Sequence, residues 1–189
     1  MFGLFKKQIH EPIEIQRQEV LKLYPEKAAT WVLGGEDCDQ ITGGYGDFGS
    51  LTSPIPVNGV IGEIKYFGKL RGKTGAALFF HRIGSVRSSV SENPIDEFEV
   101  VCLDGTQWNS LYFDMYHPRR SNLTPPGYTL MPYNKELKFD IPFAYGVVIG
   151  QVANFPFGLP DAIDEYFHGD GVYARHAREW LAKGNFSRP

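Results

Sequence analysis

Cysteine is scarce in this chain, which has only Cys38 and Cys102 among its 189 residues. The two lie far apart and form no Cys-x-x-Cys pair, so their spacing excludes a zinc knuckle and a small fold held together by disulfides. We expect both to be reduced thiols. Cys102 lies in the apolar run 100–103, which is typical of a buried cysteine. Cys38 stands in a polar loop between acidic residues, which disfavour a thiolate, and a nucleophilic role would need a histidine and an orienting acid beside the sulfur.

Long apolar runs are also missing. Even residues 143–157 are interrupted by Gly146, Gly150, Gln151 and Pro156, so no window reaches the length of a membrane span. The opening residues MFGLFKK have no long apolar stretch and no small-residue cleavage site, and they do not predict a signal peptide. The formal net charge of −3 gives no global positive field for nucleic acid or an anionic membrane. We therefore predict a cytoplasmic protein with no membrane and no nucleic-acid partner.

The usual signatures of enzymes and metal sites are absent from the sequence. No two of its five histidines stand four residues apart, as two metal ligands on one helix do. There is no His-Glu-x-x-His, no Gly-x-Ser-x-Gly and no EF-hand loop. The glycine-rich segment 43–49 lacks the Lys-Ser/Thr ending of a phosphate-binding loop. We expect no metal ion and no cofactor.

Aromatic residues are abundant, with 14 Phe, 10 Tyr and 3 Trp in a chain that is 42% hydrophobic. Such side chains build either a dense core or the walls of a concave site, and the core is the more common use. The chain length lies below that at which a second core becomes the expectation. We predict one domain over residues 1–189.

Amphipathic helices are predicted at both ends of the chain. Apolar residues recur at helical spacing in residues 11–24, and Pro25 then begins a second, short helix that reaches Trp31. Residues 159–167 and 171–183 show the same spacing, with a proline near the start of the first and a glycine just after the end of the second. The two ends of the chain are therefore expected to be helical.

Between these helices the pattern predicts strands, which we place at residues 60–67, 76–83, 97–103, 108–116, 128–131 and 143–152. Asp104-Gly105 joins the third and fourth and indicates a hairpin turn. Residues 34–58 are rich in glycine and proline, show no period and predict a long loop. The sequence thus predicts an α+β fold with a mainly antiparallel central sheet, on which helices from the N- and C-terminal segments pack.

Charge is segregated along the central part of the chain. Residues 64–91 contain six basic residues and no acid, whereas residues 92–104 contain five acids and no base. One interpretation is cross-strand pairing, which is weak for each exposed pair. The other is an electropositive face that binds a phosphate or an acidic partner protein. Its candidate binding residues are Arg82, Arg87, His117, Arg119 and Arg120, joined by the aromatic Tyr45 and Phe48 of the glycine-rich loop.

Two histidines are the candidates for acid/base chemistry. His81 and His117 each end a predicted basic strand, so both could meet at one edge of the sheet and act on a phosphate held by neighbouring arginines. The alternative is that both are amphipathic strand ends at the boundary with solvent.

Two functions therefore remain open. Segments 54–71 and 112–120 resemble small bacterial proteins without an assigned chemistry, and this resemblance implies no residue role. The first function is a non-enzymatic protein that acts through a binding surface, such as an immunity or adaptor protein that engages a partner protein. The second is a small enzyme or anion-binding domain that uses His81 and His117 with Arg82, Arg119 and Arg120. The missing catalytic signatures favour the first.

Overall fold

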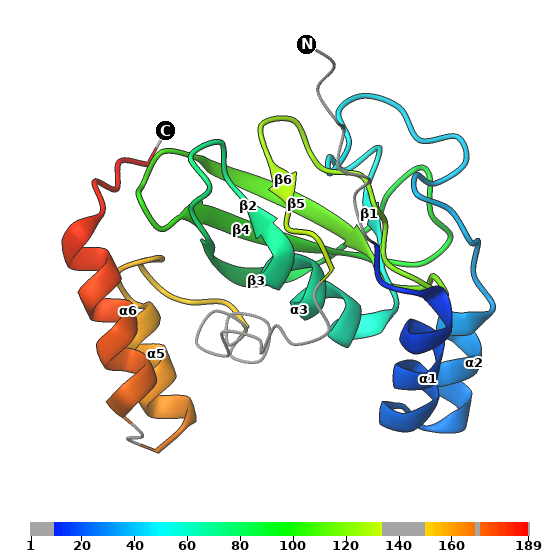
Figure 1. Cartoon of the computed structure of the whole chain (residues 1–189), viewed down its shortest axis with the longest axis horizontal. Helices are drawn as coiled ribbons and strands as arrows, with labels where there is room; N and C mark the ends of the chain where they lie inside the picture. Colours follow the sequence, from blue (N-terminus) through cyan, green and yellow to red (C-terminus); the bar gives the residue numbers. More distant parts are fainter. Residues whose placement is uncertain (1–9, 134–149, 169–170, 189) are drawn as a thin grey trace, which may run out of the picture.

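The computed structural model describes residues 10–133, 150–168 and 171–188 (Figure 1). Within these ranges the helices are α1 (Ile13–Leu23), α2 (Glu26–Leu33), α3 (Gly59–Lys69), α5 (Leu159–Tyr166) and α6 (Gly171–Lys183). The strands are β1 (Ile55–Pro56), β2 (Leu70–Arg71), β3 (Leu78–Val86), β4 (Ile95–Cys102), β5 (Trp108–Asp114) and β6 (Thr129–Leu130). The predicted α+β class is confirmed.

The main sheet has the strand order β1-β5-β4-β3. Its pairs β3–β4 and β4–β5 are antiparallel, and the turn between β4 and β5 contains Asp104 and Gly105, as the sequence predicts. Gly105 has a φ of +76°, which glycine adopts without steric cost. The short β1 pairs with β5 in parallel, so the sheet is mixed. Strands β2 and β6 form a separate antiparallel pair.

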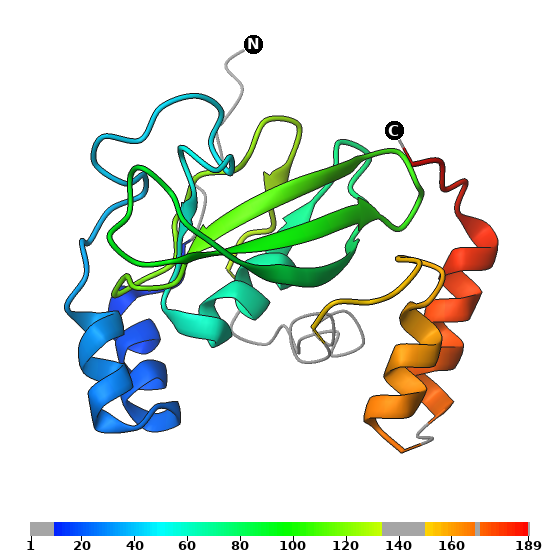
Figure 2. The same ribbon diagram turned by 180° about the vertical axis from the view of Figure 1, so that it is seen from behind.

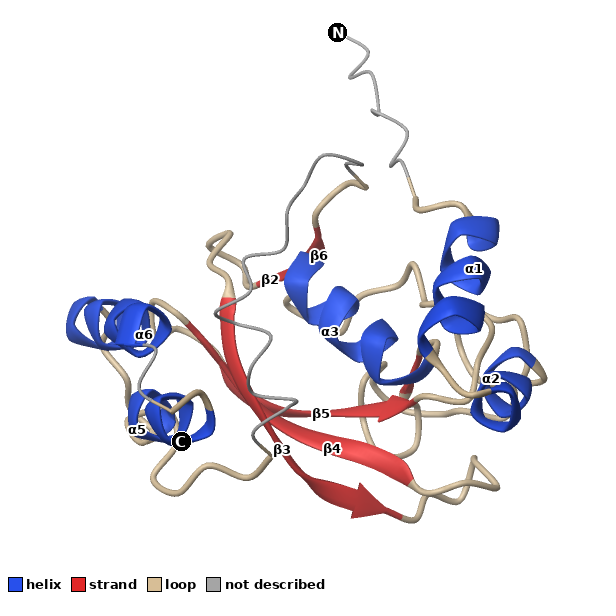
Figure 3. Ribbon diagram, turned by 90° about the horizontal axis from the view of Figure 1, so that it is seen from below, coloured by secondary structure: helices blue, strands red, loops and turns tan. Residues whose placement is uncertain are grey.

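The two faces of the sheet are covered by different helices. Alternation along β3 sends Phe80 to one face, where its ring stacks on Phe67 of α3 with centroids 4.1 Å apart. Figure 3 shows α3 lying across this face. Phe79 points to the other face and packs in a cluster with Phe155 and with Ile163 of α5. The abundant aromatic residues thus build a core on both sides of the sheet.

Helix α3 corrects one prediction, because residues 60–67 were expected to form a strand. Their β-branched residues favour a strand, but the buried positions are 59, 62, 63, 66 and 67, which is helical spacing. Glycine and glutamate occupy three of these five positions, so the buried face does not read as apolar in the sequence. A Cβ at Gly62 would stand 2.6 Å from the side chain of Asn58, so the helix needs glycine there.

Apart from the strand at residues 143–152, the remaining predicted elements are confirmed, with boundaries shifted by a few residues. Residues 34–58 form the long loop, which contains only the two-residue β1 near its end. The predicted strand 143–152 lies mostly outside the described residues, and its last three residues form no strand. Among the helices that the structure describes, none has the length and apolar character that a membrane crossing requires.

The helical pairs α1–α2 and α5–α6 stand at opposite ends of the sheet (Figures 1 and 2). Helices α1 and α2 pack mainly against each other, through a small cluster made by Val20, Ala29 and Val32. Tyr24 ties this pair to α3, since its hydroxyl oxygen accepts a hydrogen bond from the backbone N–H of Ile61 at 2.9 Å. The pair α1–α2 therefore has a core of its own that is much smaller than the core beneath α3.

Candidate functional site

Three arginines of the predicted electropositive face, Arg82, Arg119 and Arg120, are neutralised by carboxylates of the same chain. Arg82 on β3 pairs with Asp96 on β4 at 2.7 Å. Arg119 reaches back to the loop after α2, where its Nε lies 2.5 Å from Asp37 and its Nη1 lies 2.6 Å from Asp39. The two arginines thus serve separate intramolecular pairs and do not form one open anion-binding face.

Arg120 is even more completely enclosed, with 4% of its surface exposed. Its Nη2 pairs with Glu11, its Nη1 donates to Asn58 Oδ1 at 3.0 Å, and its backbone N–H donates to Gln16 Oε1 at 2.8 Å. Lys69 of α3 pairs with the same Glu11 at 3.1 Å. This network fastens the segment before α1 to α3 and to the turn after β5.

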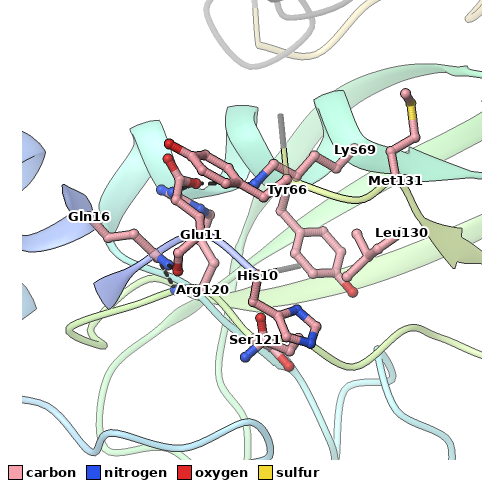
Figure 4. A pocket seen from close by; sticks show the side chains of 11 residues that line it. His10, Glu11, Gln16, Tyr66, Lys69, Arg120, Ser121, Leu130 and Met131 are labelled. Atoms are coloured by element: carbon pink, nitrogen blue, oxygen red, sulfur yellow. Dashed lines mark hydrogen bonds and ion pairs between the residues drawn. The ribbon is translucent and has the colours of Figure 1, made fainter. Parts of the chain in front are cut away.

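A small cavity lies beside this network, and Figure 4 shows the side chains that line it. Its volume is about 30 Å³, which is close to the space of one water molecule. Burial raises the pKa of Glu11, but the charges of Arg120 and Lys69 outweigh burial and hold the pKa below its usual value. Since the charged groups already neutralise one another in so small a space, the cavity is better explained as part of the network than as a ligand site.

His81 is buried on β3. Its Nε2 lies 2.9 Å from Glu99 Oε2, and its ring stacks on Phe155 with centroids 4.1 Å apart. Its Nδ1 accepts a hydrogen bond from the backbone N–H of Val152 at 2.8 Å, so this nitrogen cannot carry a proton. Burial lowers the pKa of His81, and the neighbouring Glu99 only partly opposes that effect. The histidine therefore stays neutral near pH 7.

His117 follows β5 and has the opposite character. Its Nδ1 donates to the carbonyl oxygen of Glu36 at 2.8 Å, and its Nε2 lies 3.5 Å from Asp114 Oδ1. The Sγ atom of Cys38 is 3.9 Å from Nδ1. Burial lowers the pKa of His117, but hydrogen bonds to Asp114, Cys38 and the Glu36 carbonyl together raise it to about 10. His117 is therefore an imidazolium cation at neutral pH.

The structure does not bring His81 and His117 together. Each has its own carboxylate and its own backbone partner, and the two share no hydrogen-bond partner among the described residues. Arg82, Arg119 and Arg120, which were predicted to hold an anion beside them, are paired with carboxylates of other segments. His117 lies beside Cys38 and not beside His81. The sequence could not predict this contact, because no local pattern links two residues 79 positions apart.

The other predicted binding residues divide into two groups. Phe48 is half-buried and packs against the core beneath α3. Tyr45 is exposed, and so is Arg87. The hydroxyl of Ser88 donates to the carbonyl of Leu51 at 2.7 Å, so the segment that carries Arg87 lies against the loop that carries Tyr45.

Glu63 on α3 is a buried carboxyl that the sequence does not single out. Neither carboxyl oxygen of Glu63 has a hydrogen-bond donor among the described residues. Burial and the nearby charge of Asp96 raise its pKa well above the usual value, and a protonated Glu63 can donate to Asp96. The only sequence signal for the burial of Glu63 is its apolar neighbours in segment 60–67, which was predicted to be a strand.

Across the ranges that the structure describes, no three His, Cys, Asp or Glu side chains are placed to hold a metal ion.

Two open hollows flank α1, and we call them the α1 hollows. The larger, of about 620 Å³, lies between α1 and α2 and is lined by Leu21, Tyr24, Glu26, Ala29, Thr30, Leu33 and Gly34. The smaller, of about 290 Å³, runs along α1 and is lined by Glu14, Ile15, Gln18, Glu19 and Lys22. Ile15 lines the smaller hollow and Leu21 the larger, while Leu23 and Trp31 are exposed elsewhere on the pair α1–α2. The sequence signal is that the two helices carry more apolar residues than one buried stripe needs.

Comparison with known proteins adds no relative to this description. No protein-family model matches the chain, no curated protein matches it, and no solved structure matches it.

Proposed function

We propose that this protein acts by binding a partner protein through the helical pair α1–α2, as an adaptor or immunity protein does. The observation that carries the proposal is the exposure of large apolar side chains on this pair. Leu21, Leu23 and Trp31 are 55%, 58% and 59% exposed. Several large apolar side chains exposed on one pair of short helices favour a protein interface, and tryptophan is enriched among the residues that dominate binding.

The weak internal packing of α1–α2 supports the same function. Only Val20, Ala29 and Val32 make up its buried apolar cluster. Helices of this length are marginal alone and gain most of their stability from packing of an apolar face. A partner that covers the exposed leucines and the tryptophan would supply additional apolar burial at about 25 cal/mol per Å².

The shape and charge of the α1 hollows favour an amphipathic helix of the partner as the occupant. A helix laid along α1 places apolar side chains three and four residues apart, and such side chains can enter neighbouring hollows. The exposed charges that line the hollows include Glu14 and Glu26 against Lys22, while Glu19 is paired with Lys65. A partner helix with lysine or arginine beside its apolar face fits this rim best.

The alternative of a small enzyme has less support. The predicted acid/base histidines lie in separate environments, and the three assigned arginines are paired within the chain. The small cavity beside Arg120 lacks room for a substrate larger than a few atoms.

Site-specific photo-crosslinking tests the proposal directly. A photoreactive phenylalanine analogue replaces Trp31 in one variant and Trp180, an exposed tryptophan of α6, in a control variant. Irradiation in native cells, followed by mass spectrometry, identifies what each position contacts. The expected result is one protein crosslinked at position 31 and not at position 180, through a helical segment with basic residues.

Affinity measurements with the purified partner then complete the test. Leu21→Glu is expected to weaken the dissociation constant by about tenfold or more, because it places a charge at the larger α1 hollow. Trp180→Ala is expected to leave it unchanged. Equal crosslinking at both positions, crosslinking only to a second copy of this chain, or an unchanged affinity for a folded Leu21→Glu protein would each refute the proposal.

A further inference from the structure

Cys38 lies where the loop after α2 meets the turn after β5. Its Sγ is 3.9 Å from Nδ1 of His117, and its side chain is only partly buried. Cys102, by contrast, is fully buried. Burial and the charge of Asp104 raise the pKa of Cys102 to about 11, so its thiol is inert at neutral pH. The chain thus contains one accessible cysteine beside a histidine and one internal reference cysteine.

The loop that carries Cys38 is held in place on both sides of the sulfur. Arg119 binds the carboxylates of Asp37 and Asp39, which flank Cys38. The Ser121 hydroxyl donates to the carbonyl of Asp39 at 2.6 Å. Arg119 therefore fixes the loop. It also neutralises Asp37 and Asp39, two of the acids whose negative charge would otherwise disfavour a thiolate at Cys38. These tertiary contacts hold the Cys38 sulfur in its position beside His117.

An orienting acid completes the cluster. Asp114 faces Nε2 of His117 and is itself held by the hydroxyl of Ser91 at 2.5 Å and by the backbone N–H of Tyr116 at 3.1 Å. Burial raises the pKa of Asp114, but hydrogen bonds from His117 and Ser91 outweigh it and keep this pKa below its usual value. An anion, an imidazolium and a sulfur thus lie in sequence. The Nδ1 proton of His117 is donated to the Glu36 carbonyl, so the imidazolium acts on the Cys38 sulfur through its positive charge across 3.9 Å.

We propose that Cys38 is a thiol–disulfide exchange site whose substrate is a small, soluble disulfide. The Cys38 thiolate attacks one sulfur of the disulfide, a new bond forms between Cys38 and that sulfur, and the original disulfide bond breaks. The second half leaves as a thiolate and takes up a proton, equal to the one that Cys38 lost. The disulfide is the only oxidant in this step, and excess free thiol reverses it. The chemistry needs an accessible sulfur beside a positive charge and no oxyanion hole, which matches the partly exposed Cys38 next to His117.

Oxidised glutathione serves as the probe, with the whole protein at pH 7 and intact-mass spectrometry as the readout. The expected product is a protein with one glutathione adduct, absent from Cys38→Ser and still formed by Cys102→Ser. Cys38 is expected to react at least about tenfold faster in the native protein than in urea, because unfolding separates it from His117. In urea the two cysteines are expected to react alike. Native Cys38 that reacts no faster than the unfolded chain would overturn the proposal.

The role of His117 is tested by substitution. His117→Gln is expected to slow the exchange about tenfold or more, since glutamine carries no positive charge. His176→Gln, at an exposed position of α6, is the matched control and is expected to keep the wild-type rate. A folded His117→Gln protein that reacts at the full rate would contradict the assignment. If that variant does not fold, the ratio of native to unfolded rates in the wild-type protein decides the question alone.

Discussion

His81 and His117 are both buried, and each lies beside a carboxylate, yet the two have opposite charge states. The pKa of His81 is lowered, whereas that of His117 is raised to about 10. A neighbouring acid is therefore not what decides the charge. The difference lies in the second ring nitrogen, which meets a hydrogen-bond donor in His81 and an acceptor in His117.

The donor and acceptor roles explain this contrast. In His81, the Val152 N–H needs a free lone pair on Nδ1, so a second proton on the ring would break that bond. In His117, the Glu36 carbonyl and the Asp114 carboxylate both accept, so the doubly protonated ring satisfies both. Buried histidines thus titrate according to the full set of their partners, and a single acid in contact does not predict the charge.

Removal of the two carboxylates is expected to give the largest difference in stability between the two histidine pairs. Asp114→Asn leaves the His117 cation without its counter-charge, so we expect the free energy of unfolding at pH 7 to fall by about 3 kcal/mol. The matched change Glu99→Gln keeps an oxygen that can accept from neutral His81, so we expect a loss of only about 1 kcal/mol. Urea unfolding of the two variants checks this difference. Equal losses would show that the two pairs have the same charge state.

The pH dependence of stability separates the two histidines. The pKa of His117 is higher in the folded state, so its contribution is complete below its unfolded value near 6.5 and is lost as the pH rises toward about 10. The pKa of His81 is lower in the folded state, so its contribution is present above 6.5 and is lost as the pH falls. For each, the slope is at most about 1.4 kcal/mol per pH unit.

Nuclear magnetic resonance titration of the ring protons measures both values directly. We expect the His117 signal to remain that of an imidazolium up to about pH 9, and the His81 signal to remain neutral at pH 7. The signals are assigned with His117→Gln and His81→Gln. Titration of both rings near pH 6.5 in the folded protein would contradict the comparison.

Glu63 extends the comparison to a buried acid that lacks such partners. Its pKa is raised, chiefly by burial and then by Asp96, so the folded protein loses stability as the pH rises above about 4.5. Glu63→Gln removes this cost, and we expect a gain of about 1 kcal/mol at pH 8 and little change at pH 4. Urea unfolding at the two pH values is the measurement. A loss of stability at pH 8 would mean that the Glu63 carboxylate is stabilising after all.

Much of the fold follows from local patterns. The terminal helices, the hairpin at Asp104-Gly105 and the strands β3, β4 and β5 could be predicted, because each depends on side-chain period or turn chemistry within a short window. Helix α3 could not, since Gly62 and Glu63 occupy its buried face and hide the helical period. Their burial depends on what packs around them, which no short window contains.

The candidate sites follow the same division. From the sequence, His117, Arg119 and Arg120 were placed in one candidate site with His81 and Arg82. In the structure their partners come from other segments. Arg120 meets Glu11, 109 positions away, and Arg119 meets Asp37, 82 positions away. Such pairs are set by how the loops fold back on the sheet. The same sequence pattern is therefore compatible with an open basic face and with a set of arginines that are paired within the chain.

By itself the sequence determined the α+β class, the terminal helices and the hairpin, because turn residues and apolar periods act over a few neighbouring positions. Only the tertiary structure decided which acids neutralise the arginines, which histidine carries a charge, which cysteine stands beside it, and which apolar side chains of α1–α2 stay exposed. Those properties depend on burial and on partners from distant segments, and desolvation and Coulomb interactions act through space rather than along the chain.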